Sequence, residues 1–203
     1  ADQWVLACRD AFNGLDLWKR PIANWGWSKW SAVEVGGTMR FRAPDQIFRR
    51  LVAADGAVYV TLGFNEPVVS LDGKTGKTIK EYDGTDNTAT IKFKDGILYL
   101  TKNVLDEPPG KTIMAVDAKT GKILWKRKGL RGITHQGTEM KRFTDAHLTI
   151  GEKHVFFLDG DDIGALDIKT GQEAWRTPRP EMKKGVFGHY NFNFMNFCTL
   201  VYH

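Results

Sequence analysis

Polar residues that could bind a ligand gather in the stretches between short apolar runs of the 203-residue sequence. One stretch carries hydroxyl and amide groups, and a later one carries guanidinium, imidazole and ammonium groups. This mixture suits a ligand with anionic or carbonyl oxygens. The residues are Thr85, Asn87 and Thr88 in the first stretch, Arg131, His135, Gln136 and Lys141 in the second, and Arg49 ahead of both. We expect Arg49, Thr88, His135 and Lys141 to form a ligand site; alternatively, these groups only satisfy buried backbone.

Other arrangements of polar residues predict less chemistry. The run Asp159–Gly164 resembles a calcium loop, but Ile163 stands at its fifth position and no Glu follows at the twelfth, so an acidic hairpin turn is expected. His135, His147 and His154 lack the spacing of metal ligands on one element. No phosphate-binding Gly-x-x-x-x-Gly-Lys-(Ser/Thr) motif is present. We expect no metal site and no catalytic residue from these patterns.

Composition excludes several classes of protein. The sequence is 42% hydrophobic and 26% charged, with a net charge of +5, which is ordinary for a globular chain. The basic run Lys126–Arg131 is best explained as a solvated face, because nucleic-acid binding needs more positive charge with aromatics placed to stack bases. No apolar run reaches the ~18 residues of a membrane span, and no signal peptide is recognised. The two cysteines, Cys8 and Cys198, exclude a disulfide-dense scaffold.

One motif recurs four times and organises the chain. Its pattern is Asp-x-x-(Thr/Asn)-Gly-x-x-x-Trp-(Lys/Arg), and the second copy lacks the Trp. The Asn-Gly or Thr-Gly pair predicts a tight turn with a positive φ, which the Asp side chain caps. The copies are Asp10–Lys19, Asp72–Lys80, Asp117–Lys126 and Asp167–Arg176.

Strand patterns on both sides of the motif predict blades. Each of the last three copies has period-2 runs around the turn and two further short strands upstream, so a unit holds four antiparallel strands in about 45–50 residues, as a propeller blade does. We expect full blades at 49–84, 89–128 and 146–178 and partial blades at 1–20 and 190–203. Residues 21–47 do not fit the pattern. They are expected to be an inserted aromatic and basic loop, either a packed surface loop or a lid or partner-binding patch.

The fold class expected is therefore all-β, a β-propeller of four-stranded antiparallel blades. Counting strands gives about half of a seven- or eight-bladed ring, which a protein partner or the remainder of a longer chain would complete. The alternative is that residues 1–20 and 190–203 share a fourth blade. The motif tryptophans Trp18, Trp125 and Trp175 should each be buried at a blade–blade seam.

The repeats resemble those of the pyrroloquinoline-quinone (PQQ) propellers, whose members include quinoprotein alcohol dehydrogenases and the lipoprotein of the outer-membrane β-barrel assembly machine. Residues 49–103, with Val58–Gly63 and Tyr82–Thr85, resemble uncharacterised PQQ-binding-like repeat proteins of planctomycete-type bacteria.

The resemblance implies a function without supplying a catalytic set. Quinoprotein dehydrogenases hold PQQ between a Trp and a disulfide of adjacent cysteines, beside Ca²⁺ and an Asp base. This sequence has no Cys-Cys pair and no Cys-x-x-Cys-His haem motif. We therefore expect a propeller scaffold that presents loops to a protein, glycan or small-molecule partner, in a periplasmic or other extracytoplasmic location. The alternative is part of a PQQ-dependent oxidoreductase, with PQQ as its cofactor.

Overall fold

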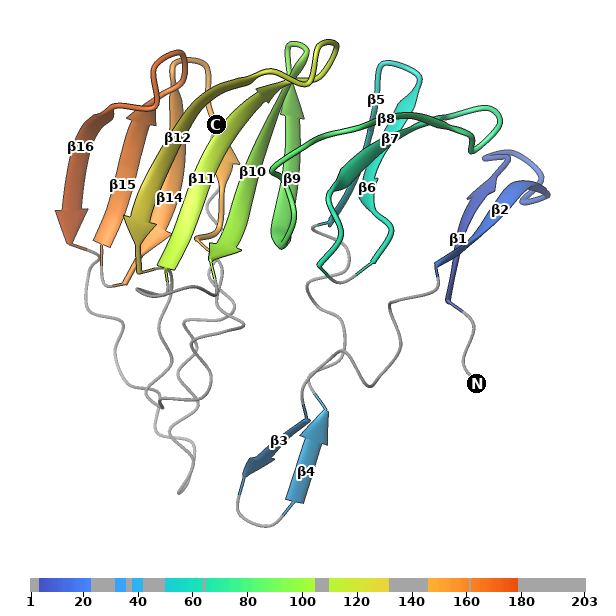
Figure 1. The fold of residues 1–203 in the computed structure, drawn as a ribbon, viewed down its shortest axis with the longest axis horizontal. Coiled ribbons are helices and arrows are strands. Elements are labelled where there is room, and N and C mark those ends of the chain that lie inside the picture. Colours follow the sequence, from blue (N-terminus) through green and yellow to red (C-terminus); the bar gives the residue numbers. More distant parts are fainter. Residues whose placement is uncertain are drawn as a thin grey trace. The chain divides into compact units, whose positions relative to one another are not determined.

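The computed structural model describes residues 4–22, 32–35, 38–41, 50–63, 65–104, 110–131, 146–160 and 162–178. Apart from one residue of 3₁₀ helix, the regular structure in this part of the chain consists of β-strands in antiparallel sheets (Figure 1). The chain divides into two compact units, residues 1–93 and 94–203. Among the residues described, no helix has the length and apolar character needed to cross a membrane.

Unit 1 contains a two-stranded hairpin and a four-stranded sheet. The hairpin pairs β1 with β2, and the larger sheet has the order β5-β6-β7-β8. A second small hairpin pairs β3 with β4. The bounds are β1 Trp4–Arg9, β2 Asp16–Ile22, β3 Ala32–Val35, β4 Thr38–Phe41, β5 Leu51–Ala54, β6 Ala57–Thr61, β7 Val68–Asp72 and β8 Thr78–Glu81.

Two further four-stranded sheets follow, with the orders β12-β11-β10-β9 and β13-β14-β15-β16. Sequential strands pair with one another, which is the meander of a propeller blade. The bounds are β9 Thr88–Lys94, β10 Ile97–Val104, β11 Gly110–Asp117, β12 Ile123–Leu130, β13 Thr149–Ile150, β14 His154–Asp159, β15 Asp162–Asp167 and β16 Glu173–Pro178. The expected all-β fold of four-stranded antiparallel sheets is thus confirmed.

The repeated motif forms a capped turn between the last two strands of each sheet, as expected. In the turn from β7 to β8, the Asp72 carboxylate accepts hydrogen bonds from the Thr75 amide, 2.7 Å away, and from the Thr75 hydroxyl, 2.8 Å away. Gly76 then takes a φ of +69°, which an L-residue with a Cβ adopts only at a cost. These bonds lower the pKa of Asp72, and the equivalent bonds from Thr120 and Thr170 lower the pKa of Asp117 and Asp167.

In unit 1, the motif tryptophan of the β1–β2 hairpin lies on the turn of the neighbouring sheet. Trp18 Nε1 donates a 3.0 Å hydrogen bond to the carbonyl of Gly73. The indole covers Gly76 so closely that a methyl group there would lie 2.7 Å from the ring. Leu6 and Trp18 pack beside the buried residues Val60, Val69 and Leu71, so the seam is continuous with the core of this unit.

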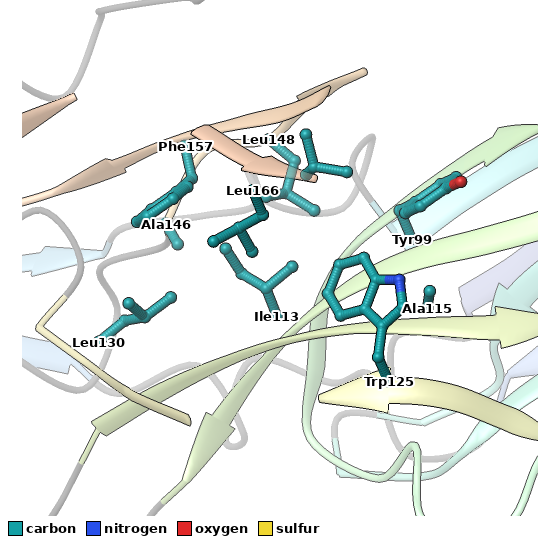
Figure 2. Packing of buried hydrophobic residues seen from close by; sticks show 10 residues of the cluster. Tyr99, Ile113, Ala115, Trp125, Leu130, Ala146, Leu148, Phe157 and Leu166 are labelled. Atoms are coloured by element: carbon teal, nitrogen blue, oxygen red, sulfur yellow. The ribbon is translucent and has the colours of Figure 1, made fainter. Parts of the chain in front are cut away.

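Unit 2 repeats this seam. Trp125 on β12 is 8% exposed, and its Nε1 donates a 3.0 Å hydrogen bond to the carbonyl of Ile168. A methyl group on Gly171 would lie 2.5 Å from the ring. Figure 2 shows Trp125 beside Tyr99, with 6.2 Å between the ring centroids, at one side of a cluster of apolar side chains from both sheets. Burial raises the pKa of Tyr99 to about 12.

Two expectations need correction. Trp175 on β16 is 42% exposed, so the prediction that all three motif tryptophans are buried is wrong for this one. The described residues contain no further turn on which its indole lies, whereas Trp18 and Trp125 each have one. Residues 21–47 were expected to be a loop, yet they contain the β3–β4 hairpin. The expected partial blade at 190–203 lies outside the described residues.

The seam predicts different costs for the same substitution at two turn glycines of unit 1. Gly14 and Gly76 have similar φ values, +72° and +69°, so alanine costs about 1–2 kcal/mol of backbone strain at either position. Only Gly76→Ala also collides with an indole, which adds about 1–3 kcal/mol of overpacking. Urea unfolding of dilute protein should therefore show the larger loss for Gly76→Ala. Equal losses in the two variants would contradict the seam.

Candidate functional site

The connections between strands differ at the two ends of each sheet, and we call each such end an edge. The turns from β5 to β6 and from β7 to β8 are short and lie at one edge. In the first, Asp55 and Gly56 both have positive φ, as a tight two-residue hairpin turn requires. Because the strands are antiparallel, every other connection leaves from the opposite edge, which we call the loop edge. The connections 105–109 and 131–148 join strand ends at this edge, and the described residue Thr88 of the predicted ligand site begins β9 there.

At the loop edge of unit 1, two threonines shape the corner between β8 and β9. The Thr85 hydroxyl accepts a 2.8 Å hydrogen bond from the Val68 amide and donates one of 2.6 Å to the Tyr82 carbonyl. The Thr88 hydroxyl donates to the Thr85 carbonyl at 2.5 Å. Both threonines are fully buried. Their hydroxyls therefore hold the chain in this corner.

Thr88 is the one residue of the predicted ligand site that the structure describes. Its hydroxyl takes part in the bond to Thr85, which is the backbone-satisfying role named as the alternative. Arg49, His135 and Lys141 lie outside the described residues, as does Gln136. The convergence of Arg49, Thr88, His135 and Lys141 on one ligand therefore stays a prediction.

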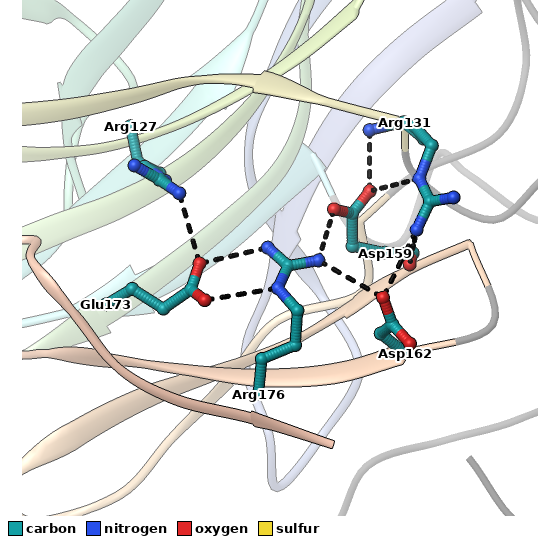
Figure 3. A network of polar contacts seen from close by, with 6 residues as sticks. All are labelled: Arg127, Arg131, Asp159, Asp162, Glu173 and Arg176. Carbon is teal, nitrogen blue, oxygen red and sulfur yellow. Dashed lines mark hydrogen bonds and ion pairs between the residues drawn. The ribbon is translucent and has the colours of Figure 1, made fainter. Parts of the chain in front are cut away.

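In unit 2, six charged side chains form a network that the sequence analysis did not anticipate and that extends from the start of β16 to the loop edge (Figure 3). It connects the end of β12, the turn from β14 to β15, and β16. Three guanidinium groups face three carboxylates, so the network is formally neutral. Its members are Arg127, Arg131, Asp159, Asp162, Glu173 and Arg176.

Asp159 is the centre of this network. Its side chain is 5% exposed, and its carboxylate accepts a 2.5 Å hydrogen bond from the backbone amide of Arg131 and one of 2.7 Å from Arg176 Nη1. The Arg131 side chain reaches the Asp159 carbonyl at 3.3 Å and the Asp162 carboxylate at 3.2 Å. The first residue of the long connection after β12 is thereby fixed to the β14–β15 turn.

Glu173 forms the second part of the network. It accepts two hydrogen bonds from Arg176, of 3.2 and 3.0 Å, and one of 3.0 Å from Arg127 on the neighbouring sheet. The hydrogen bond from Arg176 holds the pKa of Glu173 below its usual range. The same pairing, together with Asp159, raises the pKa of Arg176, which therefore stays charged.

The network anchors loops and offers no general base. Asp159 is buried between two arginines, so its carboxylate is already engaged. By contrast, the Arg131 side chain is 61% exposed, and an anion can approach it from solvent. Among the residues described, no group of three or more His, Cys, Asp or Glu side chains could hold a metal ion.

The sequence carried a signal for this network. Residues at alternate positions of a strand share a face, so Asp159 lies on the same face as Val155 and Phe157, whose side chains are in the core. A carboxylate on a core-facing position needs a cationic partner. The basic run Lys126–Arg131 supplies one, and it is therefore not only a solvated face.

Comparison with known proteins identifies the repeats. The family described as outer membrane protein assembly factor BamB matches residues 1–189. The chain belongs to this family. Two solved propellers confirm the fold. BamB from Moraxella catarrhalis superposes with a TM-score of 0.50 over 85% of this chain and 46% of its own, at 18% identity. Quinohemoprotein alcohol dehydrogenase from Comamonas testosteroni gives 0.53 over 86% and 32%, at 15% identity.

Two curated relatives are quinone-dependent enzymes. The 1-butanol dehydrogenase (quinone) of Thauera butanivorans is 25% identical over 70% of this chain, and the quinoprotein ethanol dehydrogenase of Pseudomonas aeruginosa is 26% identical over 66%. The chain spans 24% and 23% of these two proteins.

The described residues do not assemble a quinone site. Thr88 is the one described residue that was predicted to contact a ligand. It is fully buried, and its hydroxyl donates to the Thr85 carbonyl. The two cysteines of the sequence, Cys8 and Cys198, are not adjacent and so cannot form the vicinal disulfide that the resemblance implies beside a quinone.

Because Asp159 is buried and Asp162 is partly exposed, the same Asp-to-Asn substitution should reduce protein stability by different amounts at the two positions. Asp159→Asn should destabilise the protein by about 3 kcal/mol, because it removes the buried carboxylate that accepts hydrogen bonds from both the Arg131 amide and Arg176. Asp162→Asn removes a carboxylate that is 25% exposed and should cost about 1 kcal/mol or less. Thermal unfolding of both variants checks this order, and an equal or reversed order would show that Asp159 is not the anchor.

The lowered pKa of Glu173 predicts a loss of stability in acid. A carboxyl whose pKa is depressed by folding stabilises the protein above its unfolded pKa of about 4.3, and this contribution disappears as the pH falls through the folded pKa. The unfolding free energies of wild type and Glu173→Gln should differ by about 1 kcal/mol at pH 6, and this difference should shrink as the pH falls below about 4.3 and through the folded pKa. Glu152→Gln, at an exposed position between β13 and β14, is the control. A difference that persists in acid would exclude this ion pair as its source.

Proposed function

We propose that this chain is a propeller binding module that presents the loops of one edge to a protein, glycan or small-molecule partner. The observation that carries the proposal is the contrast between the two sheet edges. One edge is closed by short turns whose polar groups bond to one another. The loop edge carries the long connections, and binding residues of repeat folds lie on such connections.

The anchoring of the loop edge supports this function. A binding loop must start from a fixed point if its side chains are to meet a ligand without a large loss of entropy. Asp159 fixes the start of the 131–148 connection through the Arg131 amide, while the Arg131 guanidinium remains largely exposed. Together with the predicted residues Arg49, His135 and Lys141, it favours a partner with anionic or carbonyl groups.

We also propose an extracytoplasmic location. The family that contains this chain is described as an outer membrane assembly factor. A binding propeller in that compartment would meet proteins and glycans of the cell envelope, which fits the partner classes above.

The second candidate is part of a PQQ-dependent oxidoreductase. The observation that favours it is the match to two quinone-dependent alcohol dehydrogenases over 70% and 66% of this chain. The match covers about a quarter of those enzymes. The missing pair of adjacent cysteines counts against it, so the binding module remains the preferred function.

Binding of anionic probes tests the proposal. Isothermal titration calorimetry with polygalacturonate and with PQQ should show at least one interaction that Arg49→Ala and His135→Ala each weaken by about tenfold, equal to about 1.4 kcal/mol. Lys74→Ala and Lys169→Ala remove exposed cations from the turns at the opposite edge and should leave the affinity unchanged.

Each outcome has a defined meaning. Saturable PQQ binding that the loop-edge variants weaken, followed by alcohol-dependent dye reduction, would favour the oxidoreductase. Glycan binding with the expected pattern supports the binding module. Equal effects of variants at both edges, or no binding of either probe, would remove the support for an anion-binding loop edge.

A further inference from the structure

The strand β12 has one open side, which we define as the side that faces away from β11. The strand stands first in the order β12-β11-β10-β9, so β11 is its one neighbour among the described strands. In an antiparallel pair, every second residue directs its amide and carbonyl away from the neighbouring strand. These backbone groups can pair with another extended chain. The open side follows from the place of β12 in its own sheet, which is neither the first nor the last of those described.

Among the strands that end a four-stranded sheet in this way, β12 is the longest. It has 8 residues, whereas β8 has 4 and β16 has 6. The strand β16 also ends in Pro178, which has no amide to donate to a partner strand. Short strands and prolines are devices that keep the side of a sheet from pairing with other chains. Because β12 has neither device, it is the best suited of the three to receive an added strand.

One face of β12 carries an apolar and basic row of side chains. Its members, Leu124, Lys126 and Lys128, are all exposed, and Leu124 is 44% exposed. Trp125 and Arg127, which alternate with them, are buried and half-buried. The alternation places the row on the face of β12 that lies away from the seam. An added strand with carboxylates opposite the two lysines and an apolar group opposite Leu124 would complement this row.

The basic charge of this row is not required by the repeat. The row stands three, five and seven residues after the turn glycine Gly121. The same positions after Gly76 are occupied by Ile79, Glu81 and Asp83, which are exposed as well. The corresponding row at β8 is therefore apolar and acidic. Each blade can carry its own charge at these positions, and the charge at β12 suits an acidic partner.

The opposite face of β12 is held in place by the neighbouring sheet. The Trp125 indole lies over Gly171, and its Nε1 donates to the Ile168 carbonyl at 3.0 Å. Two residues further on, Arg127 donates to Glu173 at 3.0 Å. These contacts order β12 before a partner arrives. Binding along its open side therefore needs little further loss of entropy in the receiving strand.

From these observations we propose that the open side of β12 binds an extended acidic segment of a partner protein, which adds a strand to the sheet. Backbone hydrogen bonds attach the segment, and its side chains opposite the row determine specificity. Lysines at the side of a sheet disfavour pairing with neutral or basic strands, so Lys126 and Lys128 select for carboxylates. This surface is distinct from the loop edge and does not depend on the function proposed for that edge.

Fluorescence anisotropy with a labelled peptide tests the charge preference. The probe is the alternating peptide Thr-Glu-Thr-Glu-Thr-Leu-Thr with an N-terminal fluorescein, titrated with the 203-residue chain. Lys126→Thr and Lys128→Thr, which keep residues suited to a strand, should each weaken binding about threefold, and the double variant about tenfold. Lys119→Thr removes an exposed cation from the turn between β11 and β12 and should leave the affinity unchanged. Arg49→Ala, from the predicted ligand site, should also leave it unchanged.

Two N-methylated forms of the peptide test whether a strand is added. Amides of alternate residues in an extended chain point to opposite sides. Methylation of one alternate set therefore blocks the side that pairs with β12, and methylation of the other set leaves that side intact. One methylated peptide should bind as the unmodified probe does, and the other should bind about tenfold more weakly or worse.

The outcomes that overturn the proposal are distinct. Equal binding of the two methylated peptides would mean attraction between charges without an added strand. No binding of the probe to wild type, or an unchanged affinity in the double lysine variant, would exclude this surface as the acidic receptor. Dimers in sedimentation velocity that Lys126→Glu and Glu81→Lys each dissociate would assign the open side to a second copy of the chain. Near-UV circular dichroism confirms that the variants fold.

Discussion

The fold depends on one contact, an indole laid over a glycine in the left-handed conformation. The glycine is needed twice, because the turn requires a positive φ and because a Cβ would occupy the place of the ring. The indole Nε1 then bonds to a turn carbonyl that the sheet leaves unused. A single side chain thereby fixes both the distance and the register between neighbouring sheets. Four-stranded sheets with short strands have little other means of fixing register, since apolar side chains between them pack without direction.

This contact also explains why the two edges of the sheets differ. The Asp cap, the Thr hydroxyl and the turn glycine are all needed to present the carbonyl and the flat surface to the indole. The residues of these turns can therefore change little without loss of the seam. The loop edge does not present a surface to an indole. In unit 2, an ion network with a buried Asp159 holds a connection in place there. This is why we place the proposed binding function at the loop edge.

The sequence was sufficient for the fold because its signals are local. Each blade is a meander whose last turn is marked by Asp-x-x-Thr-Gly, and the first two blades also carry Asp-Gly at their first turn. Pairing between sequential strands follows from these turns. Burial of Trp175 was predicted wrongly because it depends on a contact with a second turn, which the motif itself does not guarantee. The Asp159 network was missed because its members are up to 49 residues apart, from Arg127 to Arg176, and only the strand face of Asp159 connects them. For the candidate ligand site, the sequence predicts only a position on the connections between blades. Convergence of the side chains depends on long connections that carry no repeat signal, so the sequence cannot predict it.

The seam explains how a chain of a family described as an assembly factor can also match quinone-dependent enzymes. Its atoms are the indole, the turn glycine and a backbone carbonyl, and none of them takes part in a redox reaction or binds a metal. Two proteins can therefore share every seam residue and differ completely at the loop edge, which is why fold alone does not imply function. The two cysteines of the sequence are not adjacent. In this chain, the loop edge carries the exposed Arg131 and an ion network that fixes the start of a connection. Such residues can recognise the charge of a partner, which is the physical basis of the binding function proposed for the propeller.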